Sequence, residues 1–440
     1  MSNPPTNYIT LDQNTQEYKD LINIFAIGNS GYTTGYIANG TFNNGSGTPI
    51  TNPDLGSIFA ANTSYSSVAF NTNYKYQTND LTNVFAPKIT YAISDQNSSI
   101  NVTEFTCTNT TTTTSYQVII FDYSGDPYWP YSTSGAIQDP PTAGSCNITF
   151  NSNLDVNLYV NTLIIGGGGG GGQGYNSGGE TCGGCGGGGG SIIFQNENSL
   201  ILPMNTTFNI QVGYNGGGNV NPAATTGSST GGGGGESFIT STIDSTALSL
   251  TAYGGGGGGG IGAVAVGGGT GGSSSYNYLN SGPTDLGGGG GGGGGTLCSD
   301  RPGPRVGGSG GNYTFYTSSP TNDGNNGDNS GSGGGTGGES FYTNVQVPFA
   351  NSSGDTSSTN VYCGNAGGGG SNSTGGGAGG TSGGAGGGSS SSSGESATNG
   401  YVSSNFFYGN GGGGSSIGPV NTSYSEANGA AGVVMIWWEI

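Results

Sequence analysis

Apolar residues occur along this chain in short runs, rich in β-branched and aromatic side chains, that are bounded by turn-forming residues. In the first half these runs cover residues 89–93, 116–121, 147–150 and 156–160. Further along they cover residues 191–194, 207–212, 248–253 and 433–438. Runs of this length and composition are typical of β-strands. The pattern therefore predicts a mainly β protein whose strands form a β-sandwich or a jelly-roll-like domain.

A different pattern occupies residues 1–88, where the motif D-L-x-x-[IV]-F-A occurs at residues 20–26, 54–60 and 80–86. Its leucine, β-branched residue and phenylalanine fall on one face of a helical turn, with the aspartate placed to cap it. The motif predicts short helices that pack locally, and an anchoring or oligomerisation region is the sharper alternative. The repeated apolar positions are Leu21, Phe25, Leu55, Phe59, Leu81 and Phe85.

After residue 165 the apolar runs alternate with runs of glycine. These cover residues 166–172, 186–190, 231–235, 254–260, 287–295, 367–370 and 411–414. A flexible linker is the simplest interpretation of a glycine run. A linker usually leaves a domain once, however, whereas these runs leave and re-enter the strand pattern repeatedly, with no polar spacer after Ile165 or Tyr253. We therefore expect the pure runs to be ordered parts of the structure.

The ordered form that suits such runs is the polyglycine II helix, with three residues per turn and a rise of about 3.1 Å per residue. It makes no internal hydrogen bonds, so a buried copy needs neighbours for every N–H and C=O group. Ordering the backbone costs about 1–2 kcal/mol per residue, so a single run is unstable and a bundle clamped by strands is required. We expect an N-terminal repeat region (1–88), a β-strand region (89–165) and a glycine-rich domain (166–440) that packs with residues 115–165.

Composition and charge argue against several classes of function. Of 440 residues 99 are glycine, and the net charge is −19 with only five lysines and arginines. Because nucleic-acid binding and polybasic membrane binding depend on basic side chains, neither is expected. The apolar run at residues 433–438 is too short to cross a bilayer, and residues 1–13 lack the pattern of a secretory signal. The chain has no histidine, which removes the Ser-His-Asp and Cys-His triads, so we expect no enzymatic activity and no cofactor.

The blocks at residues 161–172, 191–213, 251–257 and 432–436 together resemble the glycine-rich domain of tail-fibre, adhesin and virion-surface proteins of phages and large DNA viruses. The resemblance covers residues 115–440, and the D-L-x-x-[IV]-F-A motif is similar to elements in structural proteins of large eukaryotic DNA viruses. It implies a structural subunit of a virion fibre or surface appendage, located on the virion surface or outside the cell. The pair Trp437-Trp438 departs from the single aromatic residue expected near the end of that domain.

The implied subunit would assemble as a homo-oligomer, a trimer or a filament, and would contact other virion or appendage proteins. Low charge and unpaired strand edges favour such self-association. One alternative is a host-recognition adhesin whose glycine-rich tip binds a host-surface glycan or receptor. Another is a secreted matrix, pilus-like or ice-binding protein.

The six cysteines are Cys107, Cys146, Cys182, Cys185, Cys298 and Cys363. An even number in an exterior protein favours disulfides, and we expect Cys107 to pair with Cys146 and the others to staple the glycine-rich domain. The spacing Cys182-Gly-Gly-Cys185 leaves a redox motif or half of a zinc site as an alternative.

Two surface features complete the candidates. Sequons for N-glycosylation include Asn39, Asn62, Asn97, Asn101, Asn109, Asn147, Asn205 and Asn312. Residues 321–329 offer oxygen ligands at alternate positions, as calcium loops do, but Gly327 stands where a fifth-position ligand belongs. A plain polar turn is therefore the favoured interpretation, and Ca²⁺ is a weak candidate.

Overall fold

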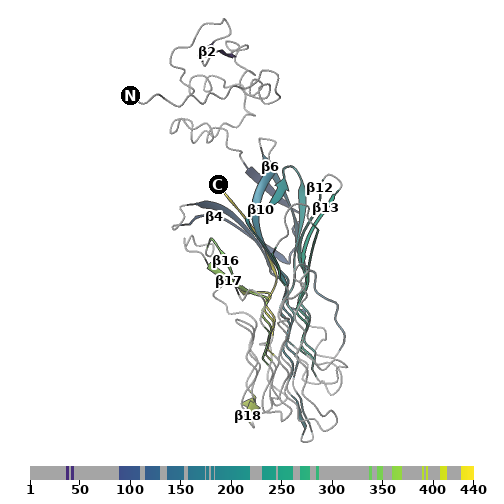
Figure 1. Cartoon of the computed structure of the whole chain (residues 1–440). Helices are drawn as coiled ribbons and strands as arrows, with labels where there is room; N and C mark the ends of the chain where they lie inside the picture. Colours follow the sequence, from purple (N-terminus) through teal and green to yellow (C-terminus); the bar gives the residue numbers. More distant parts are fainter. Residues whose placement is uncertain are drawn as a thin grey trace, which may run out of the picture. The chain divides into compact units, whose positions relative to one another are not determined.

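The structure is a computed structural model of the chain, drawn in Figure 1. It describes residues 36–38, 41–43, 89–109, 114–128, 136–152, 157–173, 175–177, 180–182, 184–218, 230–243, 246–260, 268–277, 284–286, 336–338, 344–349, 359–368, 389–390, 393–394, 407–413 and 428–440. The chain forms two compact units. One comprises Met1–Thr90 and Asn151–Val156, and the other comprises Tyr91–Phe150 and Asn157–Ile440.

In the first unit, strands β1 (Tyr36–Ala38) and β2 (Thr41–Asn43) form an antiparallel hairpin in which Ala38 pairs with Thr41. All three D-L-x-x-[IV]-F-A motifs, with Leu21, Phe25, Leu55, Phe59, Leu81 and Phe85, lie outside the described residues. The predicted short helices and their anchoring role therefore stay predictions.

Twelve strands form two six-stranded sheets. Sheet I has the order β15 (Thr284–Leu286), β10 (Ile192–Pro203), β7 (Asn157–Ile165), β21 (Val433–Glu439), β5 (Ser115–Tyr123) and β4 (Ile100–Thr108). Sheet II has the order β14 (Ser274–Asn277), β13 (Thr246–Ala252), β12 (Ser237–Ile243), β11 (Thr207–Val212), β6 (Gly144–Ser152) and β3 (Ile89–Ser94). All eight apolar runs recognised in the sequence lie at least partly within these strands. The prediction of a mainly β fold is confirmed.

The two sheets pack face to face as a β-sandwich. The indole of Trp438 on sheet I meets the rings of Phe150 and Tyr91 on sheet II edge-on, with centroid distances of 5.7 and 5.9 Å. Alternate residues of a strand point to opposite faces, so Val434 and Ile436 share this inner side with Trp438. All three side chains are buried.

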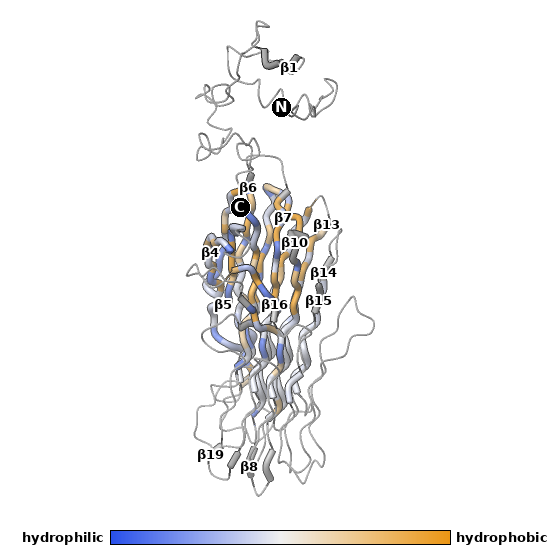
Figure 2. The backbone as a smooth tube through the Cα atoms, turned by 60° about the vertical axis from the view of Figure 1, so that its left-hand side comes forward, coloured by the Kyte–Doolittle hydropathy of each residue, from blue (hydrophilic) through white to orange (hydrophobic). Residues whose placement is uncertain are grey.

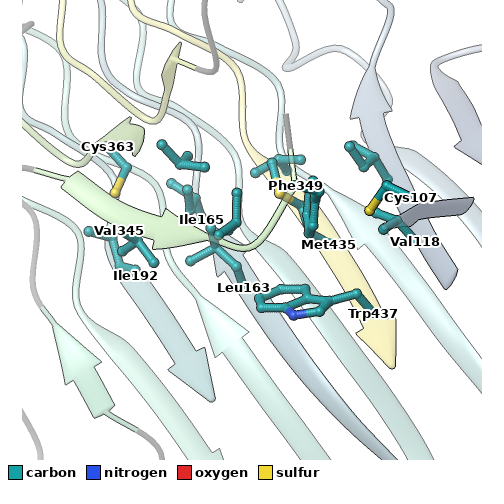
Figure 3. Close-up of a cluster of buried hydrophobic side chains, with 14 residues drawn as sticks. Cys107, Val118, Leu163, Ile165, Ile192, Val345, Phe349, Cys363, Met435 and Trp437 are labelled. Atoms are coloured by element: carbon teal, nitrogen blue, oxygen red, sulfur yellow. The ribbon is translucent and has the colours of Figure 1, made fainter. Parts of the chain in front are cut away.

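The other face of sheet I is covered by a third layer, the small sheet of β16 (Asn344–Val347), β17 (Thr359–Cys363) and β20 (Phe407–Tyr408). Figure 3 shows the buried cluster between them, with Trp437 lying beside Met435 and Phe349. The ring of Trp437 is 5.5 Å from that of Phe349 and stacks on Phe194 at 6.4 Å. Each member of the unexpected tryptophan pair thus fills a different layer.

Two further hairpins lie in the second unit. They are formed by β8 (Tyr175–Ser177) with β9 (Glu180–Cys182), and by β18 (Ser389–Ser390) with β19 (Ser393–Gly394). Figure 2 shows that the hydrophobic positions are concentrated in the strands of the sandwich, whereas the segments that continue them are nearly neutral in hydropathy. Those segments are the glycine-rich parts of the chain.

Candidate functional site: the hydrogen-bonded glycine segments

The strands of both sheets and of the third layer run directly into glycine-rich stretches, which we call the glycine segments. They comprise residues 166–172, 184–191, 213–218, 231–235, 253–260, 268–273, 364–368, 409–413 and 428–432. Each one continues, or leads into, a neighbouring strand such as β7, β10 or β21. Their positions are therefore set by the register of the sandwich.

The 166–172 segment is bonded to its neighbours with a period of three residues. Every third N–H donates to the same neighbour, and the acceptors there also lie three residues apart. Towards the 184–191 segment the bonds run from Gly166 to Ser191, from Gly169 to Gly188 and from Gly172 to Cys185, at 3.0, 2.9 and 2.8 Å. Towards the 231–235 segment they run from Gly167 to Gly235 and from Gly170 to Gly232, at 2.9 and 2.8 Å. Towards a third neighbour, the 428–432 segment, Gly168 donates to Ala430 at 2.8 Å.

The same segment accepts hydrogen bonds from three others. The donors are Gly255 and Gly258 to Gly167 and Gly170, Gly216 to Gly168, and Gly412 to Gly169, at 2.8 to 2.9 Å. Six glycine segments thus surround the 166–172 segment, three as acceptors and three as donors. The described bonds satisfy the N–H groups of residues 166–170 and of Gly172, and the C=O groups of residues 167–170, without any side chain, as buried peptide groups require.

At many glycine positions the segments approach one another too closely for a side chain. A Cβ atom built on Gly169 would lie 2.0 Å from the carbonyl oxygen of Gly256, and one on Gly187 would lie 2.1 Å from that of Gly169. Real Cβ atoms essentially never come within 3.0 Å of such an atom. Gly233 is different, because its nearest neighbour would be 3.6 Å away. Close contacts between backbones therefore require glycine at the interior positions Gly169 and Gly187, but not at Gly233.

Buried polar side chains complete the network where the glycine pattern stops. Asn410 Oδ1 accepts from the N–H of Asn365 at 3.0 Å, and Asn428 Oδ1 accepts from that of Gly218 at 2.7 Å. Asn215 donates its amide to the carbonyl of Gly429 at 3.0 Å. These asparagines were not singled out in the sequence. The signal that identifies them is a single Asn at the edge of a glycine run.

The expected disulfide between Cys107 and Cys146 is absent, because the two thiols lie in different layers. Cys107 is on β4 and belongs to the cluster on the outer face of sheet I, whereas Cys146 is buried on β6 of sheet II. Burial raises the pKa of the Cys107 thiol and raises that of Cys146 to about 11, so both stay protonated at neutral pH.

The other cysteines leave the predicted staples untested. Cys185 lies within the 184–191 segment and Cys363 at the end of β17, and both are buried. Burial also raises the pKa of the Cys363 thiol. Cys298 and the side chain of Cys182 lie outside what the structure describes.

The sequon asparagines fall into two groups. Asn101 and Asn205 are exposed. Asn97 is held by hydrogen bonds to both of its amide atoms, Asn109 donates to the carbonyl of Pro348, and Asn147 donates to Asp95 at 2.7 Å. Three more sequons, Asn39, Asn62 and Asn312, lie outside the described residues, as does the calcium-loop candidate at 321–329.

Comparisons with known proteins do not assign the chain to a family. No protein-family model and no curated protein matches the chain. Within the described part of the chain there is no group of three metal-ligating side chains and no helix long and apolar enough to cross a membrane. The glycine segments are therefore the feature on which a functional argument has to rest.

Proposed function

We propose that this chain is a structural subunit of a virion fibre or surface appendage, and that its glycine segments form a bundle of polyglycine II helices. The observation that supports the proposal is the three-residue period of the hydrogen bonds around the 166–172 segment. A β-strand presents its backbone groups with a period of two. A helix with three residues per turn sends successive N–H groups in three directions, which fits the pattern found.

The backbone angles of the segments agree with this geometry. Among the described glycines only Gly364 and Gly409 have positive φ, at 70° and 66°. Both follow directly after strands β17 and β20, where the chain changes from sheet to segment. The remaining glycines are thus free to adopt the negative φ of about −75° that characterises this helix.

Such a bundle suits an architectural role. A net hydrogen bond contributes about 0.5–1.5 kcal/mol, which is close to the 1–2 kcal/mol that ordering one glycine costs. The bundle therefore needs the sandwich, whose strands fix the ends of its segments and whose apolar layers supply the remaining stability. The product is a rod that exposes few charges and few side chains. Exterior assemblies need such a durable, repeating surface.

Two experiments test the proposal. The bundle predicts slow amide exchange at Gly167, Gly169 and Gly170 in the native full-length protein, because each N–H is bonded and buried. Exchange at those amides as fast as in an unstructured peptide would remove the physical basis of the role. Mass spectrometry and immunogold labelling of purified particles test the location. The chain should be found on the particle surface, and a chain found only inside infected or producing cells would contradict the assignment.

A further inference from the structure

Three glycine segments lie side by side at one side of the bundle. The 231–235 segment donates from Gly231 and Gly234 to the 253–260 segment, at 2.9 and 2.8 Å. The 253–260 segment in turn donates from Tyr253 and Gly256 to the 268–273 segment, at 3.0 and 2.7 Å. These three segments continue strands β12, β13 and β14, which are adjacent in sheet II. They form one continuous strip.

Some backbone groups of the strip have no hydrogen-bond partner among the described residues. Gly233, Gly254, Gly257 and Gly271 are partly exposed, and none of them donates or accepts a hydrogen bond with a described group. We call these four residues the open face. In the 166–172 segment, by contrast, the groups pointing in all three directions find partners. On the open face, the groups that point in one of the three directions have no partner among the described residues.

We propose that the open face binds the open face of a second copy of this chain, through hydrogen bonds between the two backbones. The inference rests on the proposed function, since it uses the three-residue geometry. Gly254 and Gly257 are three residues apart, so their free N–H and C=O groups repeat at roughly 9 Å along the segment. The interior segments use this same spacing to bind one another.

A second copy fits because the face is complementary to itself. Every open-face glycine offers both a donor and an acceptor. Inside the bundle the 166–172 segment is antiparallel to the 184–191 segment and parallel to the 253–260 segment, so either direction of approach satisfies the geometry. The four open-face glycines carry no Cβ atom, so a partner backbone can approach them between the exposed side chains of Tyr253 and Thr270.

Electrostatics do not oppose this contact. Glycine, tyrosine, threonine and serine make up the described part of the strip, without a charged residue. The adjoining outer side of sheet II carries polar, uncharged side chains such as Thr240, Thr242 and Ser249. The nearest carboxylate in sequence belongs to Glu236. Together with burial, its charge raises the pKa of Tyr214 in the 213–218 segment. Two like faces therefore bring no like charges together across the contact itself, although the net charge of the chain is −19.

The test combines sedimentation velocity with NMR-detected amide exchange on the full-length chain over a range of concentrations. Self-association should appear as concentration rises, and exchange at Gly254 and Gly257 should slow at least tenfold in parallel. Gly233→Glu should abolish both effects, because the added Cβ has room and the carboxylate would stand on the open face. Thr270→Glu, at an exposed position of the same strip, is a second blocking variant. Thr106→Glu, at an exposed position on β4 of sheet I, is the matched control and should associate like the wild type.

The two proposals fail in different ways. If Gly167 and Gly169 exchange slowly while Gly254 and Gly257 exchange rapidly at every concentration, the docking inference is wrong and the bundle stands. Association that persists unchanged in both blocking variants would also overturn it, since the copies would then meet through another surface. Rapid exchange at Gly167 and Gly169 would remove the bundle and the docking inference together.

Discussion

The sandwich and the glycine segments solve the same problem by opposite means. Both must satisfy every buried N–H and C=O group. In sheet I the strands pair edge to edge, and side chains such as Phe121, Ile164 and Trp438 fill the space between layers. Packed sheets are consequently about 10 Å apart. In the glycine segments most residues have no side chain, and the backbones themselves fill most of the interior.

The difference teaches that the two regions should respond in opposite directions to a change in side-chain size. Removing atoms from the sandwich leaves a cavity, whereas adding atoms to the segments forces the backbones apart. A set of substitutions that either removes or adds atoms can therefore test whether the two regions are stabilised as differently as their geometry indicates.

The largest effect is expected from truncation in the sandwich. Trp438→Ala removes a ring that is 3% exposed and contacts Phe150 and Tyr91 across the two sheets. Substitutions of this type cost about 3–5 kcal/mol. Urea unfolding followed by tryptophan fluorescence measures the loss. A midpoint close to that of the wild type would show that the inner layer is not a close-packed core.

The next effect is expected from adding one methyl group to the bundle. Gly169→Ala places a Cβ 2.0 Å from the carbonyl oxygen of Gly256, and overpacking of this kind costs about 1–3 kcal/mol. The matched control is Gly233→Ala, whose Cβ has 3.6 Å of space. Because alanine restricts the unfolded chain more than glycine does, this control should stabilise by about 0.4–1 kcal/mol.

Both variants are compared by the midpoint of thermal unfolding and by amide exchange at Gly188, which accepts the bond from Gly169 and donates to Gly256. The interior variant should speed exchange at Gly188, and the control should leave it unchanged. Equal effects of the two variants would mean that the interior segments are as loosely packed as the outer one.

A smaller effect is expected at a point where a side chain bonds to a strand backbone. Thr162 on β7 is buried and donates its hydroxyl to the carbonyl of Met435 on β21 at 2.9 Å. Thr162→Val keeps the shape but removes this bond, at a cost of about 0.5–1.5 kcal/mol. Thr103→Val, on the edge strand β4, is the control and measures the effect of replacing threonine by valine alone. Equal losses in the two variants would show that the hydroxyl bond contributes nothing specific.

The smallest effect is expected from a titratable group between sheet I and the third layer. Asp122 on β5 accepts a hydrogen bond from the hydroxyl of Tyr408 at 2.8 Å, and burial raises the pKa of its carboxyl group. The folded protein therefore keeps this proton at a pH where the unfolded chain has lost it. By linkage, the free energy of unfolding falls as pH rises through that range.

Asp122→Asn cannot ionise but still offers an oxygen to Tyr408. The stability of this variant relative to the wild type should therefore rise between acidic and neutral pH, as measured by urea unfolding at a series of pH values. A difference that is independent of pH, or that changes in the other direction, would contradict the assignment. Glu439→Gln, at the exposed end of β21, is the control for removing a carboxylate elsewhere.

The strand pattern was largely predictable, because β-branched and aromatic runs at residues 116–121 and 207–212 leave few alternatives. Strands rich in hydroxyl groups, such as β12 (Ser237–Ile243), were missed, since serine and threonine also mark loops. The hairpin of β1 and β2 flanks Asn39-Gly40, which is a strong turn signal that went unused.

That glycine runs such as 166–172 form ordered, hydrogen-bonded segments was predictable, but their arrangement was not. Identical residues carry no information about which segment lies beside which, so the register comes from the flanking strands and from asparagines such as Asn410. The predicted disulfide between Cys107 and Cys146 is wrong for a related reason. Sequence spacing does not show that Cys107 and Cys146 face different layers, because that depends on which strands join which sheet.

The place of β21 has a consequence for synthesis. This strand lies between β5 and β7 and is antiparallel to both, and its Met435 accepts a hydrogen bond from Thr162 of β7, which lies 273 positions earlier in the sequence. Until the ribosome has released residues 433–439, β5 and β7 each leave unpaired the strand edge to which β21 later bonds. Sheets with such late, distant pairings form slowly and are prone to aggregate meanwhile. Nascent chains of this protein should therefore depend on chaperones, or on slow translation, more than their content of 30% hydrophobic residues suggests.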